Sequence, residues 1–350
     1  MPRRRYFSET ESEDEKNIPP PKKKKTVVIQ RPRIKFEELP SIKSLDDLIK
    51  IAETSKWYKN INNVMLWEIL PHLKELQSMI GMKSVKESIF FQIIYYLQGL
   101  HLRNIDGDYL HTIITGKAGT GKTTVSKIIG HIHQHMGILS SSSNKFKVVS
   151  REDFIGEFLG STAVKTKKLL TSCLGGCIFV DELYSLGPGQ KDRDSYSKEA
   201  IDTINLFLSE HKNDFCFIGA GYKDDIEKCF FSVNQGLKRR FQWYHNIEDY
   251  QYEDLVDIFF KMVKDINWNI NVEKKDLIEI FNKNKDLLVN GGGSCENLLS
   301  KIKVCHSIRV FGKELEYKFV IVKEDVVDAF LLLKKFDMNK QPKITYDYFT

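Results

Sequence analysis

A short glycine-rich segment constrains the fold of this chain more than any other feature. Residues 116–123 read Gly-Lys-Ala-Gly-Thr-Gly-Lys-Thr and fit the pattern GxxxxGK[ST], directly after the apolar run Leu110 to Thr115. The segment that follows has helical spacing as far as about His135. In this context, a loop between strand and helix wraps its backbone N–H groups around phosphates, and the helix N-terminus adds a partial positive charge. The pattern therefore predicts a nucleotide-binding loop at a strand-to-helix turn.

The residues of this loop have separate expected roles. Lys122 would reach the β and γ phosphates of a bound nucleotide, and the Thr123 hydroxyl would ligate Mg²⁺. The residues expected to line the nucleotide are Gly116, Lys117, Ala118, Gly119, Thr120, Gly121, Lys122, Thr123 and Thr124. The structural alternative is a tight strand-to-helix turn that binds no ligand.

A second apolar run, Cys177 to Val180, ends in two acids. Asp181 is placed to hold the Mg²⁺ coordination shell. Glu182 is placed to orient and deprotonate the attacking water, which contributes roughly 10²–10⁴ in rate. Small GTPases position this water with a glutamine, so the acidic pair favours ATP as the nucleotide. The sequence thus predicts an ATPase whose cofactors are ATP and Mg²⁺.

Strand and helix patterns alternate between about residue 109 and residue 248. The runs expected to be strands are 110–115, 146–150, 177–181, 215–220 and 241–245. Such alternation predicts a parallel sheet covered by helices on both faces. The expected organisation is a disordered charged tail (1–34), a helical lead-in (35–79), an α/β nucleotide-binding domain with a five-stranded parallel sheet (80–248), a smaller, mostly helical domain (249–340) and a C-terminal tail (341–350).

Charge is concentrated at the N-terminus. Residues 1–34 hold ten Lys or Arg and five Asp or Glu, so most of the net charge of +6 lies there and the remainder is nearly neutral. A nearly neutral body does not favour nucleic-acid binding, although the basic tail could provide it. The run Lys22 to Lys25 after three prolines resembles a nuclear-import signal, with a solvated charge run as the alternative. We expect a cytoplasmic or nuclear protein.

The cysteines and histidines indicate no metal or disulfide framework. The six cysteines include no CxxC pair, and several lie in apolar runs, which predicts buried thiols in a reducing compartment. His131, His133 and His135 follow one another along the helix after the loop. Because no acid or cysteine is near them in the sequence, we expect solvated histidines at a helix end. No apolar run is long enough to span a membrane, and no secretory signal is visible.

Five further segments follow in a fixed order. They are Gly156-Glu-Phe-Leu-Gly-Ser-Thr-Ala-Val-Lys-Thr166, Phe179-Val-Asp-Glu-Leu-Tyr-Ser-Leu186, Glu199-Ala-Ile-Asp-Thr203, Gly219-Ala-Gly-Tyr222 and Asn234-Gln-Gly-Leu-Lys-Arg-Arg-Phe241. With these segments, residues from about 80 to 264 resemble the CbxX/CfqX-type AAA+ ATPases, the group of rubisco-activase-like and sporulation stage V protein K-like proteins. The layout also resembles AAA+ proteins of large DNA viruses. The resemblance implies a P-loop NTPase sheet of the AAA+ type followed by a helical lid domain.

The resemblance also implies roles for particular residues. Phe158, Leu159 and Gly160 match the pore loop that grips a polypeptide in the channel of the ring, although Phe158 could instead cover the core. Ile80 and Gly81 match the segment that packs against adenine. Tyr222 occupies the sensor-1 position, where many AAA+ proteins have asparagine.

Two arginines match the position of the arginine finger. Arg240 would reach the γ-phosphate in the neighbouring subunit, and such a group supplies about 10³–10⁵ in rate in related phosphoryl transfer. Arg239 could share or replace that role. The alternative is that both arginines pair with surface acids.

One departure from the family pattern concerns the lid. The family has Gly-Asn-Ala-Arg at the start of a lid helix, and its arginine touches the γ-phosphate as sensor 2. Here the matching residues, 292–295, read Gly-Gly-Ser-Cys. Lys301 and Lys303 lie one to two helical turns further on. Coupling of hydrolysis to lid motion is therefore in question.

The predicted function is an oligomeric ring, a hexamer by resemblance, that hydrolyses ATP to remodel or thread a protein client. The first alternative is a nucleic-acid motor or clamp-loader-like protein. The second is a scaffold that binds ATP and turns it over slowly, as the missing sensor-2 arginine would suggest.

Overall fold

The structure is a computed structural model that describes residues 35–54, 56–103, 107–140, 145–158, 160–188 and 194–338. The predicted tails at 1–34 and 341–350, the Lys22 to Lys25 run and Leu159 lie outside these residues. The described residues from Phe36 onward belong to one compact unit.

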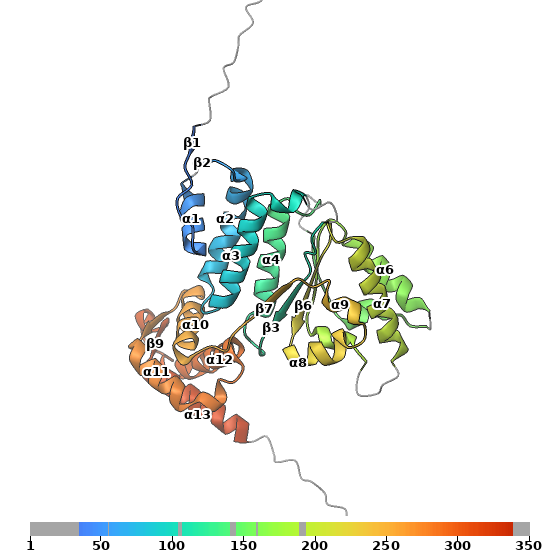
Figure 1. Ribbon diagram of the computed structural model, residues 1–350. Helices are drawn as coiled ribbons and strands as arrows, with labels where there is room; N and C mark the ends of the chain where they lie inside the picture. Colours follow the sequence, from blue (N-terminus) through green and yellow to red (C-terminus); the bar gives the residue numbers. More distant parts are fainter. Residues whose placement is uncertain are drawn as a thin grey trace, which may run out of the picture. The chain divides into compact units, whose positions relative to one another are not determined.

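Five parallel strands form the central sheet in the order β4-β5-β6-β3-β7 (Figure 1). They are β3 (Thr112–Thr115), β4 (Phe146–Val149), β5 (Cys177–Val180), β6 (Cys216–Gly221) and β7 (Trp243–Asn246). The predicted five-stranded parallel sheet is confirmed. The last strand begins two residues later than expected because Phe241 packs among Phe217, Phe230 and Phe231 in the core and takes no part in the ladder.

Both faces of the sheet are covered by helices, which explains why its strands are apolar throughout. Along β5, Cys177 and Phe179 face one core and Ile178 and Val180 face the other. The first face is covered by α2 (Asn63–Ser78), α3 (Lys83–Leu97) and α4 (Lys122–His135), and the second by α6 (Ser161–Ser172) and α7 (Ser195–Glu210). In Figure 1 the two helical layers flank the strands.

The lead-in region contributes to the first of these cores. Helix α1 (Leu45–Glu53) begins where the Ser44 hydroxyl accepts a hydrogen bond from the Asp47 backbone, at 3.2 Å. Its buried side chains, such as Leu48, belong to the same apolar cluster as α2 to α4. Two short parallel strands, β1 (Phe36–Glu37) and β2 (Trp57–Tyr58), pair with each other beside it.

The C-terminal region is helical and has a hydrophobic core of its own. Its elements are α10 (Tyr252–Asp265), β8 (Asn269–Asn271), α11 (Lys274–Lys283), α12 (Gly291–Arg309), β9 (Val320–Val322) and α13 (Lys323–Met338). The pair β8–β9 was not predicted, since three-residue strands carry too little periodicity to recognise. We call this region the lid.

Short helical segments connect these elements. They are Leu100–Arg103, α5 (Arg151–Phe154), Leu183–Leu186, α8 (Lys223–Asp225), Ile226–Phe231, α9 (Gln235–Lys238), Lys285–Leu287 and Leu315–Tyr317. Among the described residues, no helix combines the length and apolar character needed to cross a membrane.

Candidate nucleotide-binding site

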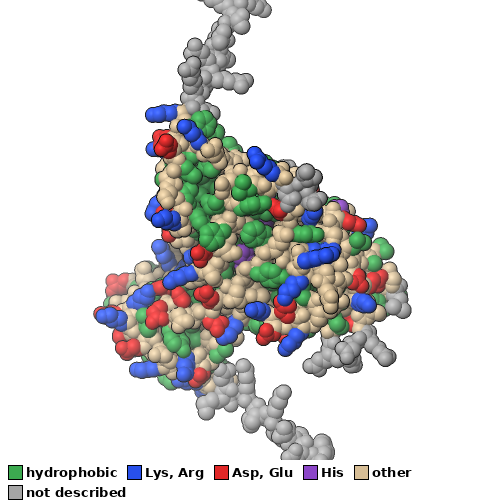
Figure 2. All heavy atoms as spheres, viewed as in Figure 1, with side chains coloured by type: hydrophobic (Ala, Val, Ile, Leu, Met, Phe, Trp, Pro, Cys, Tyr) green, Lys and Arg blue, Asp and Glu red, His purple; other side chains and the backbone are tan. Residues whose placement is uncertain are grey.

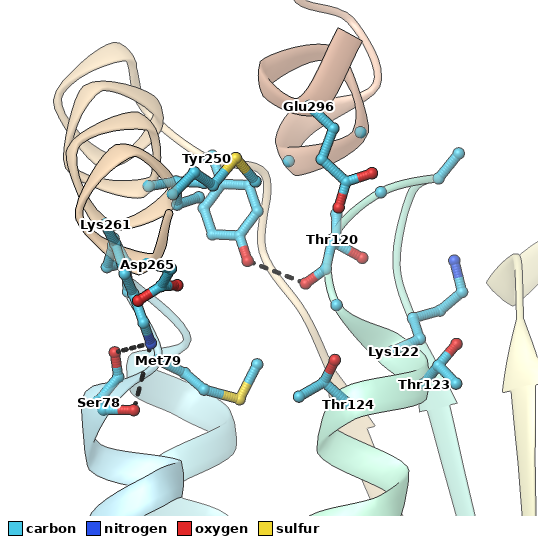
Figure 3. A pocket seen from close by; sticks show the side chains of 18 of the residues that line it. Ser78, Met79, Thr120, Lys122, Thr123, Thr124, Tyr250, Lys261, Asp265 and Glu296 are labelled. Carbon is cyan, nitrogen blue, oxygen red and sulfur yellow. Dashed lines mark hydrogen bonds between the residues drawn. The ribbon is translucent and has the colours of Figure 1, made fainter. Parts of the chain in front are cut away.

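A cavity of about 650 Å³ lies between the glycine loop, the end of α2 and the lid helices α10 and α12. Residues 118–124 and the acids Asp181 and Glu182 line one side of it. In Figure 3, Met79, Tyr250 and Lys261 face Thr120, Lys122 and Thr123 across the cavity. The remaining lining residues are Glu75, Ser78, Ile80, Ile258, Met262, Asp265, Gly292, Gly293 and Glu296.

The glycine loop has the backbone shape that its sequence predicts. Gly119 and Gly121 have φ of +69° and +90°, a region that side chains disfavour. Helix α4 begins at Lys122, so its first N–H groups lie at the cavity. Free N–H groups at a helix N-terminus suit an anion such as a phosphate.

Lys122 is held against the loop by hydrogen bonds. Its Nζ donates to the carbonyl oxygens of Gly116 at 3.1 Å and Lys117 at 2.8 Å. The ring of Tyr222 lies 5.4 Å from the same nitrogen, measured to the ring centroid. The residue expected at the sensor-1 position thus neighbours the lysine that is expected to bind phosphate.

Thr123 and Asp181 come together across 58 residues of sequence, and Glu182 lies beside them. Thr123 Oγ1 donates to Asp181 Oδ2 at 3.2 Å, and the Glu182 backbone N–H donates to Asp181 Oδ1 at 3.0 Å. A hydroxyl and a carboxylate are the hard oxygen ligands that Mg²⁺ prefers, so the pair fits this ion.

The backbone at Glu182 is unusual for a residue with a side chain, with φ 52° and ψ 47°. Burial raises the pKa of the Glu182 carboxyl, the charge of Asp181 raises it further, and Lys122 lowers it. A carboxylate with a raised pKa is a stronger base than an ordinary one. The position suits proton transfer at the cavity.

The opposite side of the cavity is formed by Met79, Ile80 and Tyr250. Gly81, with φ +68°, lies behind them, where an added Cβ would be 3.3 Å from the Tyr250 ring. The Tyr250 hydroxyl donates to the Thr120 carbonyl at 2.9 Å. An apolar side bounded by an aromatic ring can hold a nucleotide base.

Sequence reasoning missed the polar residues on this side. Lys261 donates from Nζ to the Ser78 carbonyl at 3.1 Å and to its hydroxyl at 3.3 Å. Asp265 lies one turn further along α10, and Glu296 lies on α12. No local pattern marks them, since helices far apart in sequence bring them to the cavity.

The lid touches the glycine loop through the main chain. The Gly292 N–H donates to the Gly119 carbonyl at 2.9 Å, and an added Cβ on Gly119 would lie 2.0 Å from the Asn290 carbonyl oxygen. The cavity lining, among the described residues, includes neither Lys301 nor Lys303. Lys301 instead places its Nζ 5.1 Å from the Phe336 ring centroid.

The predicted pore-loop residues lie away from the cavity. Phe158 is 73% exposed, so the alternative that it covers the core is wrong. Gly160 has φ +80° and leads directly into α6. An exposed aromatic side chain on a loop is available to touch another molecule.

The two candidate finger arginines differ in exposure. Arg240 is only 8% exposed, and its guanidinium donates to the Ser209 hydroxyl at 2.6 Å and to the Gly236 carbonyl. Arg239 is exposed. Among the described residues neither arginine forms an ion pair with an acid, so the surface-pairing alternative is not supported.

The expectation of solvated histidines is wrong for His133. Its side chain is buried, and its Nδ1 lies 3.5 Å from Cys216 Sγ, because α4 packs this face against the sheet. His131 and His135 are partly buried, and the ring of His72 lies 5.1 and 4.7 Å from theirs. The prediction of buried thiols holds for Cys177 and Cys216.

Comparison with known proteins identifies the family. A family model described as "ATPase family associated with various cellular activities (AAA)" matches residues 112–242. A cfxQ-like protein of Acanthamoeba polyphaga mimivirus is 38% identical over 283 residues, which cover 79% of this chain and 68% of that protein. The chloroplastic ribulose bisphosphate carboxylase/oxygenase activase of Cyanidioschyzon merolae is 34% identical over 217 residues, 59% of this chain and 67% of the activase.

A solved structure agrees with the fold. The FIGL-1 AAA domain, crystallised with ADP, has a TM-score of 0.54 at 15% identity over 86% of this chain and 97% of that one. The fold and the sequence relatives together define a nucleotide-binding AAA domain. The chain belongs to the AAA ATPases and, within them, to the CbxX/CfqX-type group.

Proposed function

We propose that this protein hydrolyses ATP with Mg²⁺ and acts, as a hexameric ring, on a protein client. The observation that carries the hydrolytic part is the contact of Thr123 with Asp181 at 3.2 Å, in one cavity with Lys122 and Glu182. Lys122 would hold the β and γ phosphates, and Thr123 with Asp181 would hold Mg²⁺. Glu182 would take the proton of the attacking water.

A ring is supported by what one subunit does not bring to its own cavity. Among the described residues that line it, Lys122 and Lys261 are the basic ones, and Lys261 is bonded to Ser78. A further cation near the γ-phosphate would have to come from a neighbouring subunit. The exposed Arg239 needs no rearrangement to do this, whereas Arg240 would first have to leave Ser209 and Gly236.

A protein client is supported by Phe158 and by the relatives. Phe158 is exposed, two residues before Gly160, on the loop between α5 and α6. The relative from Cyanidioschyzon merolae is named an activase of another enzyme. On the face shown in Figure 2, basic and acidic side chains are interspersed over the lid, a pattern that does not favour a nucleic-acid surface.

Subunit mixing tests the ring. Arg239→Ala and Arg240→Ala should each bind ATP like the parent, and the variant that lacks the finger should hydrolyse it far more slowly. Added to an equal amount of Glu182→Gln subunits, that variant should regain activity in about a quarter of the sites, where an intact arginine meets an intact Glu182 across an interface. Arg103→Ala, at another exposed arginine, is the control.

The client is tested in the same assay with an unfolded polypeptide such as casein. It should raise the parent's rate, and Phe158→Ala should lose that increase while keeping the basal rate. Phe91→Ala, at an exposed aromatic on α3, is the matched control.

Activity per subunit that stays constant down to demonstrated monomers, with both arginine variants unimpaired, would refute the ring. A parent that binds ATP and Mg²⁺ without turnover would instead favour the alternative of a slow-turnover scaffold. The described residues that line the cavity include no arginine from the lid, which agrees with that alternative.

A further inference from the structure

Three side chains of the kinds that ligate metals meet between the sheet and α4, at the end of α4 that lies away from the nucleotide cavity. The ligand atoms of His133, Cys177 and Cys216 all lie within 4.8 Å of one another, and all three residues are buried. His133 Nδ1 is 3.5 Å from Cys216 Sγ. Cys177 and Cys216 are the first residues of β5 and β6, whereas the acids of the nucleotide site follow the last residue of β5.

The backbone fixes this convergence. The register of the parallel pair β5–β6 places Cys177 directly beside Cys216, so both thiols point to the same face of the sheet. Gly130 lets α4 approach that face, since an added Cβ there would lie 2.5 Å from the Phe146 ring and 3.5 Å from Cys177 Cβ. His133, three residues further along α4, lies on the same helical face.

The donor set suits a divalent ion that favours thiolates. Two thiolates, a neutral imidazole and a divalent cation sum to zero charge, which avoids the cost of an unpaired buried charge. Sulfur and nitrogen ligand atoms that share one tetrahedral Zn²⁺ are about 3.5–3.8 Å apart, as follows from Zn–S near 2.3 Å and Zn–N near 2.0 Å. The 3.5 Å between His133 and Cys216 is already close to this spacing.

A second layer of contacts supports the imidazole. The Gln92 side-chain amide, also buried, lies 3.1 Å from His133 Nε2. With a metal on Nδ1, the Nε2–H would donate to the amide oxygen of Gln92. A rotation of the Gln92 amide group by about 180° brings that oxygen to the position of its nitrogen.

A second cavity lies close to the cluster. It measures about 280 Å³ and is lined in part by Tyr96 and Leu110. The Tyr96 ring centroid is 6.2 Å from that of His133, and Cys216 Sγ lies 3.4 Å from the Leu110 carbonyl oxygen. With three protein ligands, a water would take the fourth position of a tetrahedral ion.

We propose that His133, Cys177 and Cys216 bind a divalent, thiolate-preferring metal ion of the Zn²⁺ type. The ion ties the end of α4 to the first residues of β5 and β6. It is separate from the Mg²⁺ expected beside Thr123 and Asp181, where the ligands are oxygens.

Cobalt titration of the reduced, full-length chain tests the site. One equivalent of Co²⁺ should produce thiolate-to-metal charge-transfer bands and the intense visible bands of tetrahedral coordination, and Zn²⁺ should displace it. Cys177→Ala and Cys216→Ala should each lower the affinity at least about 100-fold, since losing a ligand costs no less than losing a second-layer contact. Cys173→Ala, at a buried thiol of the same domain outside the cluster, should bind like the parent.

The spectrum separates this site from its competitors, because cobalt at Thr123 and Asp181 or at His72, His131 and His135 gives no thiolate band. A parent without that band, or bands kept in both variants, would overturn the proposal. So would a parent that holds Cu⁺ but no divalent ion, or one whose Cys177 and Cys216 form a disulfide in place of binding. Should the variants fail to fold, mass spectrometry of the intact parent decides: one Zn²⁺ retained per chain supports the site, and none refutes it.

Discussion

Helix α4 begins and ends in two different chemical environments. At Lys122 it opens on a cavity lined by charged groups and hydroxyls, with Asp181 and Glu182 on the same side. At His133 it packs into an interior of thiols, an imidazole and an amide, which carry no net charge without an ion. The first end suits hard ligands such as phosphates and Mg²⁺, and the second suits a soft one. The two ends of the helix can bind different ligands because one lies at the carboxyl ends of the strands and the other at their amino ends.

The largest effect should come from the charged end. Lys122→Ala removes the cation that we propose holds the β and γ phosphates, and it should abolish ATP binding in a calorimetric titration. Lys127→Ala, at an exposed lysine of the same helix, should bind ATP normally. Cobalt binding at the other end of α4 should be unchanged in both variants. ATP affinity close to the parent's in Lys122→Ala would contradict the assigned role.

A change of the base alone should separate binding from chemistry. Glu182→Gln should bind ATP and Mg²⁺ like the parent and lose at least about 100-fold in turnover, because the amide cannot accept the water's proton. Steady-state phosphate release measures this, with Glu152→Gln, at an exposed acid, as the control. Turnover equal to the parent's would point to another acid as the base.

The smallest effect should come from the buried end, and it should concern stability. In Gly130→Ala the new methyl meets the Phe146 ring, and overpacking of this kind costs about 1–3 kcal/mol. Urea unfolding measures the loss, while ATP affinity should stay near that of the parent. Phe146→Leu added to Gly130→Ala should recover part of the stability. A single variant as stable as the parent would show that α4 can shift away from the sheet at no cost.

The sequence predicted which residues meet at the charged end of α4 and did not predict which residues meet at its buried end. Residues 116–123 and the pair Asp181–Glu182 are short contiguous patterns, and the alternation of strands and helices was enough to predict the parallel sheet. His133, Cys177 and Cys216 meet only through strand register and helix packing, which no local pattern encodes. Lys261 and Glu296 escaped notice for the same reason. The burial of Arg240 could not be predicted either, because it depends on a hydrogen bond to Ser209, which lies 31 residues away on α7.

The main-chain hydrogen bond between Gly292 and Gly119 joins the first turn of α12 to the glycine loop. The helix has 19 residues and is therefore about 28 Å long, so a tilt of about 10° at the loop displaces its far end by about 5 Å. Near that far end lie Ile308 and Phe311, which are 74% and 91% exposed. Any such tilt would displace exposed apolar surface, and the hydrogen bond that joins the helix to the loop involves no side chain.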